Sequence, residues 1–147
     1  MDAFCERVTL SLRDLFSFNC MIDLISKLDA DEDAVGQIIT EIEASGLQPN
    51  TVTFNAVLHY HAVRGNQRGI NSTLELMKSR EVEMDCITMN SCIDCCAKNG
   101  DSRAAIRTFD QMSERIKPCI MTYNIVLNAI AKDESLDDSR QEPSQIA

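Results

Sequence analysis

The sequence predicts an all-α protein, an α-solenoid built from helix–turn–helix repeats of about 35 residues. The first observation is a triplet of the form Thr-x-Asn that recurs almost periodically. Its copies occupy residues 53–55, 88–90 and 122–124, and a weaker Ser-Phe-Asn copy occupies 17–19. The second is that several further residue types recur in phase with it. The third is a composition of 44% hydrophobic but only 5% aromatic residues, which suits a small helical domain.

The further matches form columns of residues that share a size or a backbone role. The paired glycines are Gly65 and Gly100, and the small column is Ala34, Gly69 and Ala104. The bulky apolar columns are Ile39, Leu74 and Phe109, and Ile42, Met77 and Met112. Chance does not keep so many columns in phase over three units, so we interpret the chain as an array.

Three full repeats and a partial fourth are expected. Residues 1–14 form a cap or a remnant helix, the units span 15–50, 51–85, 86–119 and 120–132, and 133–147 is an acidic, disordered tail. Each unit begins with a first helix, over 16–28, 52–64, 87–99 and 121–132. A second helix follows, over 32–44, 67–80 and 102–114.

The turns inside the units carry helix-stop and helix-start signals. Gly65-Asn66 and Gly100-Asp101 each place a glycine where a helix ends and a capping side chain where the next begins. The first unit has three residues, 29–31, at this place, and an aspartate there can cap as well. We expect the small column that follows to let helices approach closely, so that Ala104→Leu would overpack the contact.

Most faces of each first helix are apolar, which requires burial on most sides and therefore stacked neighbours. One line of residues at spacings of four stays polar and begins with an asparagine in every unit. Its members are Asn19, Asp23 and Lys27; Asn55 and His59; Asn90, Asp94 and Lys98; and Asn124, Asn128 and Lys132. Side by side, these lines are expected to form the exposed concave wall. A solvated groove is the plain alternative, but four asparagines out of four favour binding through amide hydrogen bonds.

The triplet, the glycine, the methionine that ends the second helix and the closing Pro-Asn or Asp resemble the pentatricopeptide repeat family. The resemblance covers about residues 15–132, and residues 51–85 match the pattern best. The tetratricopeptide repeat is the nearest alternative, but its pattern carries a tryptophan and this chain has none. The resemblance implies a right-handed solenoid, with the first helices on the inside.

It also implies a function in binding single-stranded RNA, about one base per repeat. The triplet Asn and the closing residue of each unit would read one base edge, in the pairs Asn19–Asn50, Asn55–Asp85 and Asn90–Cys119, with Asn124 lacking a clear partner. The family pattern then gives pyrimidine-U-pyrimidine, read 5′ to 3′ along the chain, although cysteine is an unusual closing residue. The residues that would sandwich bases are Phe16, Val52, Ile87 and Met121, and those facing phosphates are Lys27, Lys98 and Lys132. In the second unit the lysine is replaced by Val63, with Arg64 adjacent.

The charge predicts that this RNA binding is weak for the chain alone. The net charge is −9, and nucleic-acid affinity depends on lysine and arginine. The deficit lies at the two ends, because residues 51–119 hold nine bases against eight acids. The acidic surface, or an uncovered last repeat, instead suits a protein partner, and a protein-interaction scaffold is the alternative function.

Other function classes find little support in the sequence. No apolar run approaches the roughly 20 residues of a membrane span. The only two histidines, His59 and His61, lie on different helix faces, and no phosphate loop or catalytic triad is present, so neither an enzyme nor a cofactor is expected. Cys92 and Cys95 form a lone C-x-x-C, so we interpret the seven cysteines mainly as reduced core residues rather than metal ligands. The resemblance implies a mitochondrial or plastid protein, although residues 1–13 show no clear targeting peptide.

Overall fold

The computed structural model describes residues 3–28, 32–112 and 116–133, and this part of the chain contains seven α-helices and no strand. The first helices of the units are α1 (Ala3–Leu28), α3 (Thr51–Val63), α5 (Cys86–Lys98) and α7 (Ile120–Lys132). The second helices are α2 (Glu32–Ala44), α4 (Gln67–Ser79) and α6 (Ser102–Asp110). The predicted helical repeat is confirmed.

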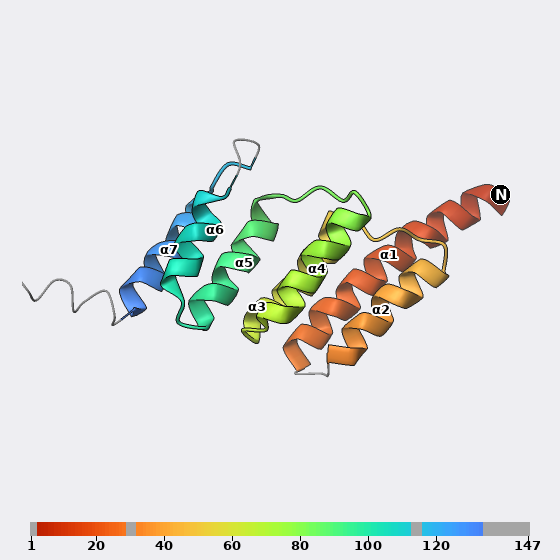
Figure 1. The fold of residues 1–147 in the computed structure, drawn as a ribbon. Coiled ribbons are helices and arrows are strands. Elements are labelled where there is room, and N and C mark those ends of the chain that lie inside the picture. Colours follow the sequence, from red (N-terminus) through yellow and green to blue (C-terminus); the bar gives the residue numbers. More distant parts are fainter. Residues whose placement is uncertain (1–2, 29–31, 113–115, 134–147) are drawn as a thin grey trace, which may run out of the picture.

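The helices form two layers, as Figure 1 shows. In one layer α1, α3, α5 and α7 pack against each other in chain order. The other layer consists of α2, α4 and α6, each of which packs on the first helix of its own unit. A solenoid of this kind is held together by contacts between sequence neighbours, so each junction between units can be examined separately.

The helix bounds agree with the predicted ones to within a residue or two, except at two places. Helix α1 begins at Ala3, so residues 3–14 continue the first helix of the first unit instead of forming an element of their own. Helix α6 ends at Asp110, where the amide of Gln111 donates to the carbonyl of Arg107 at 3.0 Å. The predicted end of this helix, at residue 114, and the predicted tail lie outside the described residues.

The turns between paired helices follow the predicted stop-and-cap pattern. Gly65 and Gly100 have φ angles of 64° and 72°, a left-handed conformation that glycine adopts without steric cost. The next residue then caps the following helix: Asn66 accepts from the amide of Gly69 at 3.0 Å, and Asp101 from that of Ala104 at 2.9 Å. These caps fix the angle between the two helices of a unit.

The core consists of three clusters, one at each junction between units. The first contains Ile22, Val35, Ile38, Ile39, Ile42, Val57 and Tyr60; the second Phe54, Leu58, Ala62, Ile70, Met77, Cys92 and Cys95; and the third Ile93, Cys96, Ala105, Val126 and Ala129. Each cluster combines both helices of one unit with the first helix of the next. Burial of these side chains, at about 1.5–3 kcal/mol for each large one, is what stacks the units.

The small column has a steric reason in the second unit. A Cβ atom added to Gly69 would lie 2.2 Å from Nδ1 of His61, which is itself buried. No side chain larger than hydrogen fits there unless the His61 ring moves. His61 therefore packs between α3 and α4.

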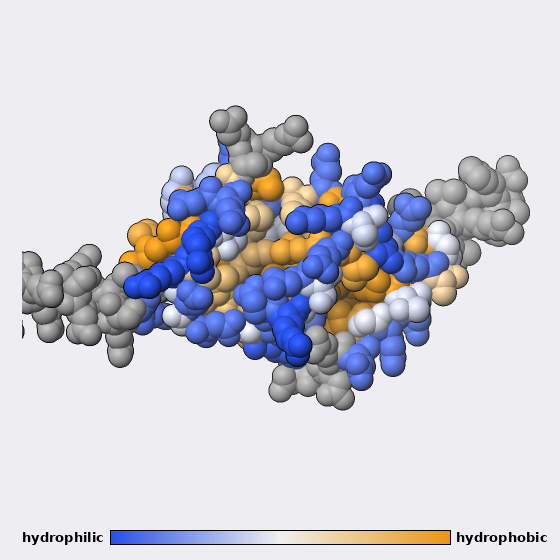
Figure 2. All heavy atoms as spheres, in the orientation of Figure 1, coloured by the Kyte–Doolittle hydropathy of each residue, from blue (hydrophilic) through white to orange (hydrophobic). Residues whose placement is uncertain are grey.

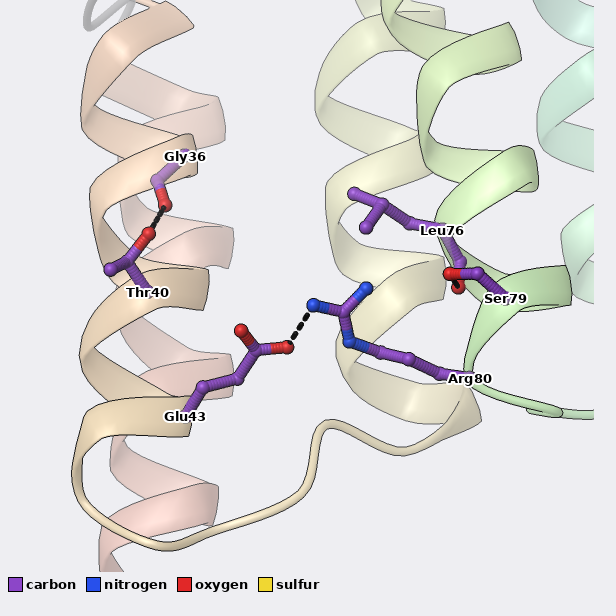
Figure 3. Close-up of polar contacts among 6 residues, drawn as sticks. All are labelled: Gly36, Thr40, Glu43, Leu76, Ser79 and Arg80. Carbon is purple, nitrogen blue, oxygen red and sulfur yellow. Dashed lines mark hydrogen bonds and ion pairs between the residues drawn. The ribbon is translucent and has the colours of Figure 1, made fainter.

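The second helices are less tightly joined to each other than the first helices. A groove of about 300 Å³ separates α2 from α4, and hydrophobic residues are visible between these helices in Figure 2. Its apolar lining includes Val35, Ile39 and Leu76. Glu43 of α2 and Arg80 after α4 bridge it through an ion pair of 2.5 Å (Figure 3). None of the described helices combines the length and the hydropathy needed to cross a membrane.

Candidate nucleic-acid interface

The junction between α3 and α5 is held by a hydrogen-bonded triad of Asn55, Asp85 and Thr88. Asn55 Nδ2 donates to Asp85 Oδ1 at 3.0 Å, and Thr88 Oγ1 lies 2.7 Å from Asn55 Oδ1 and 2.9 Å from Asp85 Oδ1. Asp85 is also the N-cap of α5, since its Oδ1 accepts from the amide of Thr88 at 3.0 Å. One carboxylate oxygen thus caps one helix and anchors the preceding one.

These hydrogen bonds set the charge of Asp85. Burial by itself would raise its pKa, but donation from the Thr88 amide, from Asn55, from the Thr88 hydroxyl and from the Ile87 amide outweighs the burial, so the pKa of the carboxyl is lowered. At neutral pH, Asp85 is therefore an anion placed beside the Asn55 amide.

The next junction, between α5 and α7, repeats this arrangement with a thiol in place of the carboxylate. Thr122 Oγ1 donates to Asn90 Oδ1 at 2.7 Å, and Asn90 Nδ2 donates to Cys119 Sγ at 3.7 Å. Cys119 is the N-cap of α7, and its amide donates to Thr122 Oγ1 at 3.1 Å. The predicted pairs Asn55–Asp85 and Asn90–Cys119 are thus in contact.

The first predicted pair is arranged differently. Asn50 caps α3 through its Oδ1, which accepts from the amide and from the hydroxyl of Thr53, both at 3.0 Å. The buried Oδ1 of Asn19 has no hydrogen-bond partner within the described residues. Asn124, in the last unit, is exposed.

The expectation that every unit exposes its asparagine is wrong for the two middle units. Asn55 is 8% exposed and Asn90 is 5% exposed, because the closing residue of their own unit and the threonine of the next triplet cover them. The recurrence of Thr-x-Asn therefore has a structural reason: the threonine of one unit bonds the asparagine of the unit before. Each of these amides still keeps a second N–H and a second acceptor site for another partner.

The four residues expected to sandwich bases form an exposed apolar column beside the asparagines. Phe16, Val52, Ile87 and Met121 are exposed to 71%, 61%, 59% and 62%. Large apolar side chains at one repeat position, one in each unit and all uncovered, do not contribute to the core. Such surfaces mark places where something binds.

The lysines expected to face phosphates are exposed, but the second unit lacks a counterpart. Lys27 forms an ion pair with Asp23 at 2.8 Å, and both side chains are more than half exposed. Lys98 and Lys132 are exposed at the ends of α5 and α7. In the second unit the Arg64 guanidinium lies 3.9 Å from the centre of the Tyr60 ring, so this cation packs against its own helix.

The cysteines whose side chains the structure describes divide into two groups. Cys92, Cys95 and Cys96 are buried, as expected, and burial raises the pKa of Cys92 to about 12 and that of Cys95 to about 11. Cys20, Cys86 and Cys119 are not buried, so three of the six cysteines whose side chains are described lie outside the expected core role. The Sγ atoms of Cys86 and Cys119 lie 3.3 Å apart, a proximity that the sequence analysis missed. The repeat register contained the signal, because Cys86 opens the third unit and Cys119 closes it.

Comparisons with known proteins identify the same kind of repeat in this chain. A model of the pentatricopeptide repeat domain matches residues 77–133, and a second model, of the PPR repeat family, matches residues 49–98. Together they span more than half of the chain.

The similar proteins carry the same repeat. A mitochondrial pentatricopeptide repeat-containing protein of Arabidopsis thaliana is 27% identical over 127 residues, which are 84% of this chain and 22% of that protein. A chloroplastic one is 26% identical over 128 residues, 78% of this chain and 16% of that protein. The crystal structure of the pentatricopeptide repeat protein PPR10 from maize matches with a TM-score of 0.70 and 25% identity, over 90% of this chain and 18% of that one. This chain spans about a fifth of the length of these proteins, and it belongs to the pentatricopeptide repeat family.

Proposed function

We propose that this chain binds single-stranded RNA, at about one base per repeat, with the preference pyrimidine-U-pyrimidine read 5′ to 3′ along the chain. The single observation that carries the proposal is the exposed column of Phe16, Val52, Ile87 and Met121 beside the asparagines. An apolar surface repeated once per unit suits flat aromatic rings spaced along a strand, since stacking on a base contributes about 1–3 kcal/mol.

The second unit supplies chemistry suited to uracil. Uracil presents one N–H donor between two carbonyl acceptors on its Watson–Crick edge. The Asp85 carboxylate is anionic. Its hydrogen bonds from the Asn55 side chain, the Thr88 amide and the Thr88 hydroxyl all end on Oδ1. In the proposed complex Oδ2 of Asp85 accepts from the uracil N–H, while the second N–H of Asn55 donates to a uracil carbonyl.

Affinity is expected to be low for this chain alone. Stacking and edge contacts over three or four units give only a modest gross free energy of binding. Association itself costs on the order of 4–15 kcal/mol. The net charge of −9 adds no attraction for phosphate, and Arg64 packs on Tyr60. We therefore propose that the chain acts as part of a longer array, in the RNA processing, stability or translation of a mitochondrion or plastid, where its relatives are named to reside.

The test is a change of base preference produced by one atom. Asp85→Asn keeps a capping side chain but replaces the anion with an amide, so the second unit is expected to shift from uracil toward cytosine. Asp101→Asn makes the same substitution at the N-cap of α6, where the cap is made to Ala104 within its own helix. Binding of fluorescent RNAs of U, C or A would be measured at low and moderate salt.

The outcomes separate base reading from mere stacking. A rise in the C-to-U affinity ratio for Asp85→Asn, but not for Asp101→Asn, supports the proposal. Binding that is indifferent to base in the wild type, or no binding by the folded protein, contradicts it.

A protein-interaction scaffold is the second candidate, and the groove between α2 and α4 favours it. This groove of about 300 Å³ combines an apolar lining with the Glu43–Arg80 pair at its rim. Leu76→Glu, which introduces a charge at an exposed position of the lining, would abolish the capture of such a partner and leave RNA binding unchanged. Loss of RNA binding in that variant would count against a separate protein site.

A further inference from the structure

Two thiols from opposite ends of the third unit meet at the surface. Cys86 is the first residue of α5 and Cys119 is the N-cap of α7, so 33 residues separate them in the chain. Their Sγ atoms lie 3.3 Å apart, and the Thr122 hydroxyl lies 3.3 Å from one and 3.4 Å from the other. A disulfide has an S–S distance of about 2.05 Å, so the two side chains need to close by little more than an ångström.

The surroundings activate one of the two thiols. Hydrogen bonds from the hydroxyl and the backbone amide of Thr122, from Cys86 and from Asn90 lower the pKa of Cys119 to about 6. The start of α7 also presents its positive end to this sulfur. Cys119 is exposed and Cys86 is partly exposed, so a small reagent can reach the pair. An accessible thiolate beside a second thiol is the arrangement found in redox-sensitive cysteine pairs.

We propose that Cys86 and Cys119 form a thiol–disulfide exchange site that reacts with low-molecular-weight disulfides of the oxidised glutathione class. The Cys119 thiolate attacks one sulfur of the small disulfide, forms a mixed disulfide and releases one small thiolate. Cys86 then loses its proton to solvent and attacks Cys119 Sγ, which displaces the second small thiolate. Two protein thiols are oxidised and one small disulfide is reduced to two thiols.

Closure of this disulfide acts on the junction that holds the last unit. Cys119 Sγ accepts from Asn90 Nδ2, and Asn90 in turn accepts from Thr122. In the disulfide the sulfur is no longer an anion, so its hydrogen bond with Asn90 weakens. If the proposed RNA function holds, the third base contact changes with oxidation while the second, at Asp85, does not; this consequence rests on that function, whereas the disulfide itself does not.

The primary test measures the bond directly, without RNA. The full chain would be equilibrated with mixtures of reduced and oxidised glutathione, trapped by acid and alkylation, and examined by intact mass and peptide mapping. The wild type is expected to lose two free thiols and to give one linked peptide pair that contains Cys86 and Cys119. Cys86→Ser is expected to stop at the mixed disulfide on Cys119, and Cys119→Ser to lose this reaction.

Two controls keep the test decisive. Cys20→Ser removes an exposed cysteine elsewhere and is expected to leave the linkage unchanged. Serine is a favoured N-cap residue, so Cys119→Ser is expected to fold, which circular dichroism checks. At pH 7, alkylation of Cys119 in Cys86→Ser is expected to be about fourfold faster than that of a cysteine of ordinary pKa, because the gain in thiolate exceeds the loss of nucleophilicity.

The proposal is overturned if oxidised glutathione leaves both thiols free in the folded wild type, or if the linked peptides involve other cysteines. A disulfide that forms without any effect on RNA binding would leave the exchange site standing and count against the proposed base contact. If oxidised glutathione forms no disulfide and the protein still binds RNA, the exchange site is overturned and the proposed RNA function stands.

Discussion

The junction between α3 and α5 and the junction between α1 and α3 start from the same pattern and close differently. In the later junction, Asp85 Oδ1 accepts from both Thr88 and Asn55, so one atom joins three side chains across two units. In the earlier one, Asn50 Oδ1 bonds Thr53 alone, and Oδ1 of Asn19 is buried without a partner among the described residues. Matching triplets therefore do not guarantee matching contacts.

The closing residue decides how much a junction gains from its triplet. A carboxylate has two oxygens that only accept, and hydrogen bonds to a charged group are stronger than neutral ones. The Asp85 anion holds a threonine and an asparagine together through one of its oxygens, whereas the neutral Asn50 oxygen accepts only from Thr53 within the described residues. The first helices of the second and third units, α3 and α5, are consequently joined by polar contacts as well as by apolar packing. Between α1 and α3 the aliphatic cluster dominates, and the ion pair that links these two units, Glu43 with Arg80, lies between α2 and the end of α4.

Replacement of the threonine should distinguish the two junctions most strongly. Thr88→Val leaves Asn55 Oδ1 and the Asp85 amide without their partner, so we expect a loss of about 2–3 kcal/mol in the free energy of unfolding. Thr53→Val breaks only contacts to Asn50, and about 1 kcal/mol is expected. Urea denaturation of both variants measures the difference. Equal losses would show that the bond between units contributes nothing.

The glycines of the second helices α2 and α4 give a second contrast. Gly69→Ala drives a methyl group into the His61 ring, and a loss of about 1–3 kcal/mol is expected. Gly36 has no atom within 4 Å of an added Cβ, so Gly36→Ala in α2 should gain about 0.5–1 kcal/mol from helix propensity. Thermal unfolding followed by circular dichroism would show shifts of opposite sign. A stabilised Gly69→Ala protein would mean that His61 moves away freely.

Replacement of the triplet asparagines should also cost more stability at the junction between α3 and α5 than at the junction between α1 and α3. Asn55→Ala removes a donor from Asp85 and an acceptor from Thr88, so about 1–2 kcal/mol is expected to be lost. Asn19→Ala deletes an unpartnered buried oxygen, and its effect should stay within about 0.5 kcal/mol. The measurement is again chemical denaturation. A large loss for Asn19→Ala would reveal a contact made by its amide nitrogen or its stem.

The repeat, its helices and its caps could be predicted because they depend on local chemistry. Periodic apolar residues, a glycine with positive φ and a capping side chain act within one turn of the chain, so Gly65 and Asn66 were assigned from the sequence. The start of α1 at Ala3 was not predicted, because the repeat register places a unit boundary at residue 15, whereas the sequence carries no helix-stop signal there and the helix runs through it.

The sequence predicted which residues pair at the candidate site, but not how deeply they are buried. The pairs Asn55–Asp85 and Asn90–Cys119 meet as expected, but the burial of both asparagines depends on threonines of the following units. Such covering depends on how closely two units stack, which no single repeat encodes. The repeat register places Cys86 and Cys119 at the two ends of the third unit, but the distance of 3.3 Å between their sulfur atoms depends on how α7 stacks on α5.

The last expected effect is electrostatic and separates Asp85 from its uncharged counterpart Asn50. The pKa of Asp85 is lowered on folding, so its contribution to stability is present above the ordinary value of 3.8 and is lost as the pH falls through the lowered pKa. Asp85→Asn keeps the cap and is expected to lose about 1 kcal/mol of stability at pH 7, because solvent screens the partly exposed charge. The fall of stability with pH below about pH 4 should be less steep in this variant. Urea denaturation at pH values from 7 to 3 measures the free energy of unfolding and so both effects. Asp101→Asn is the control, and it is expected to keep the loss of stability at acid pH that comes from Asp85. An unchanged slope in Asp85→Asn would mean that the carboxylate gains no net stabilisation from its bonds to Asn55 and Thr88, and that the two junctions differ in geometry but not in strength.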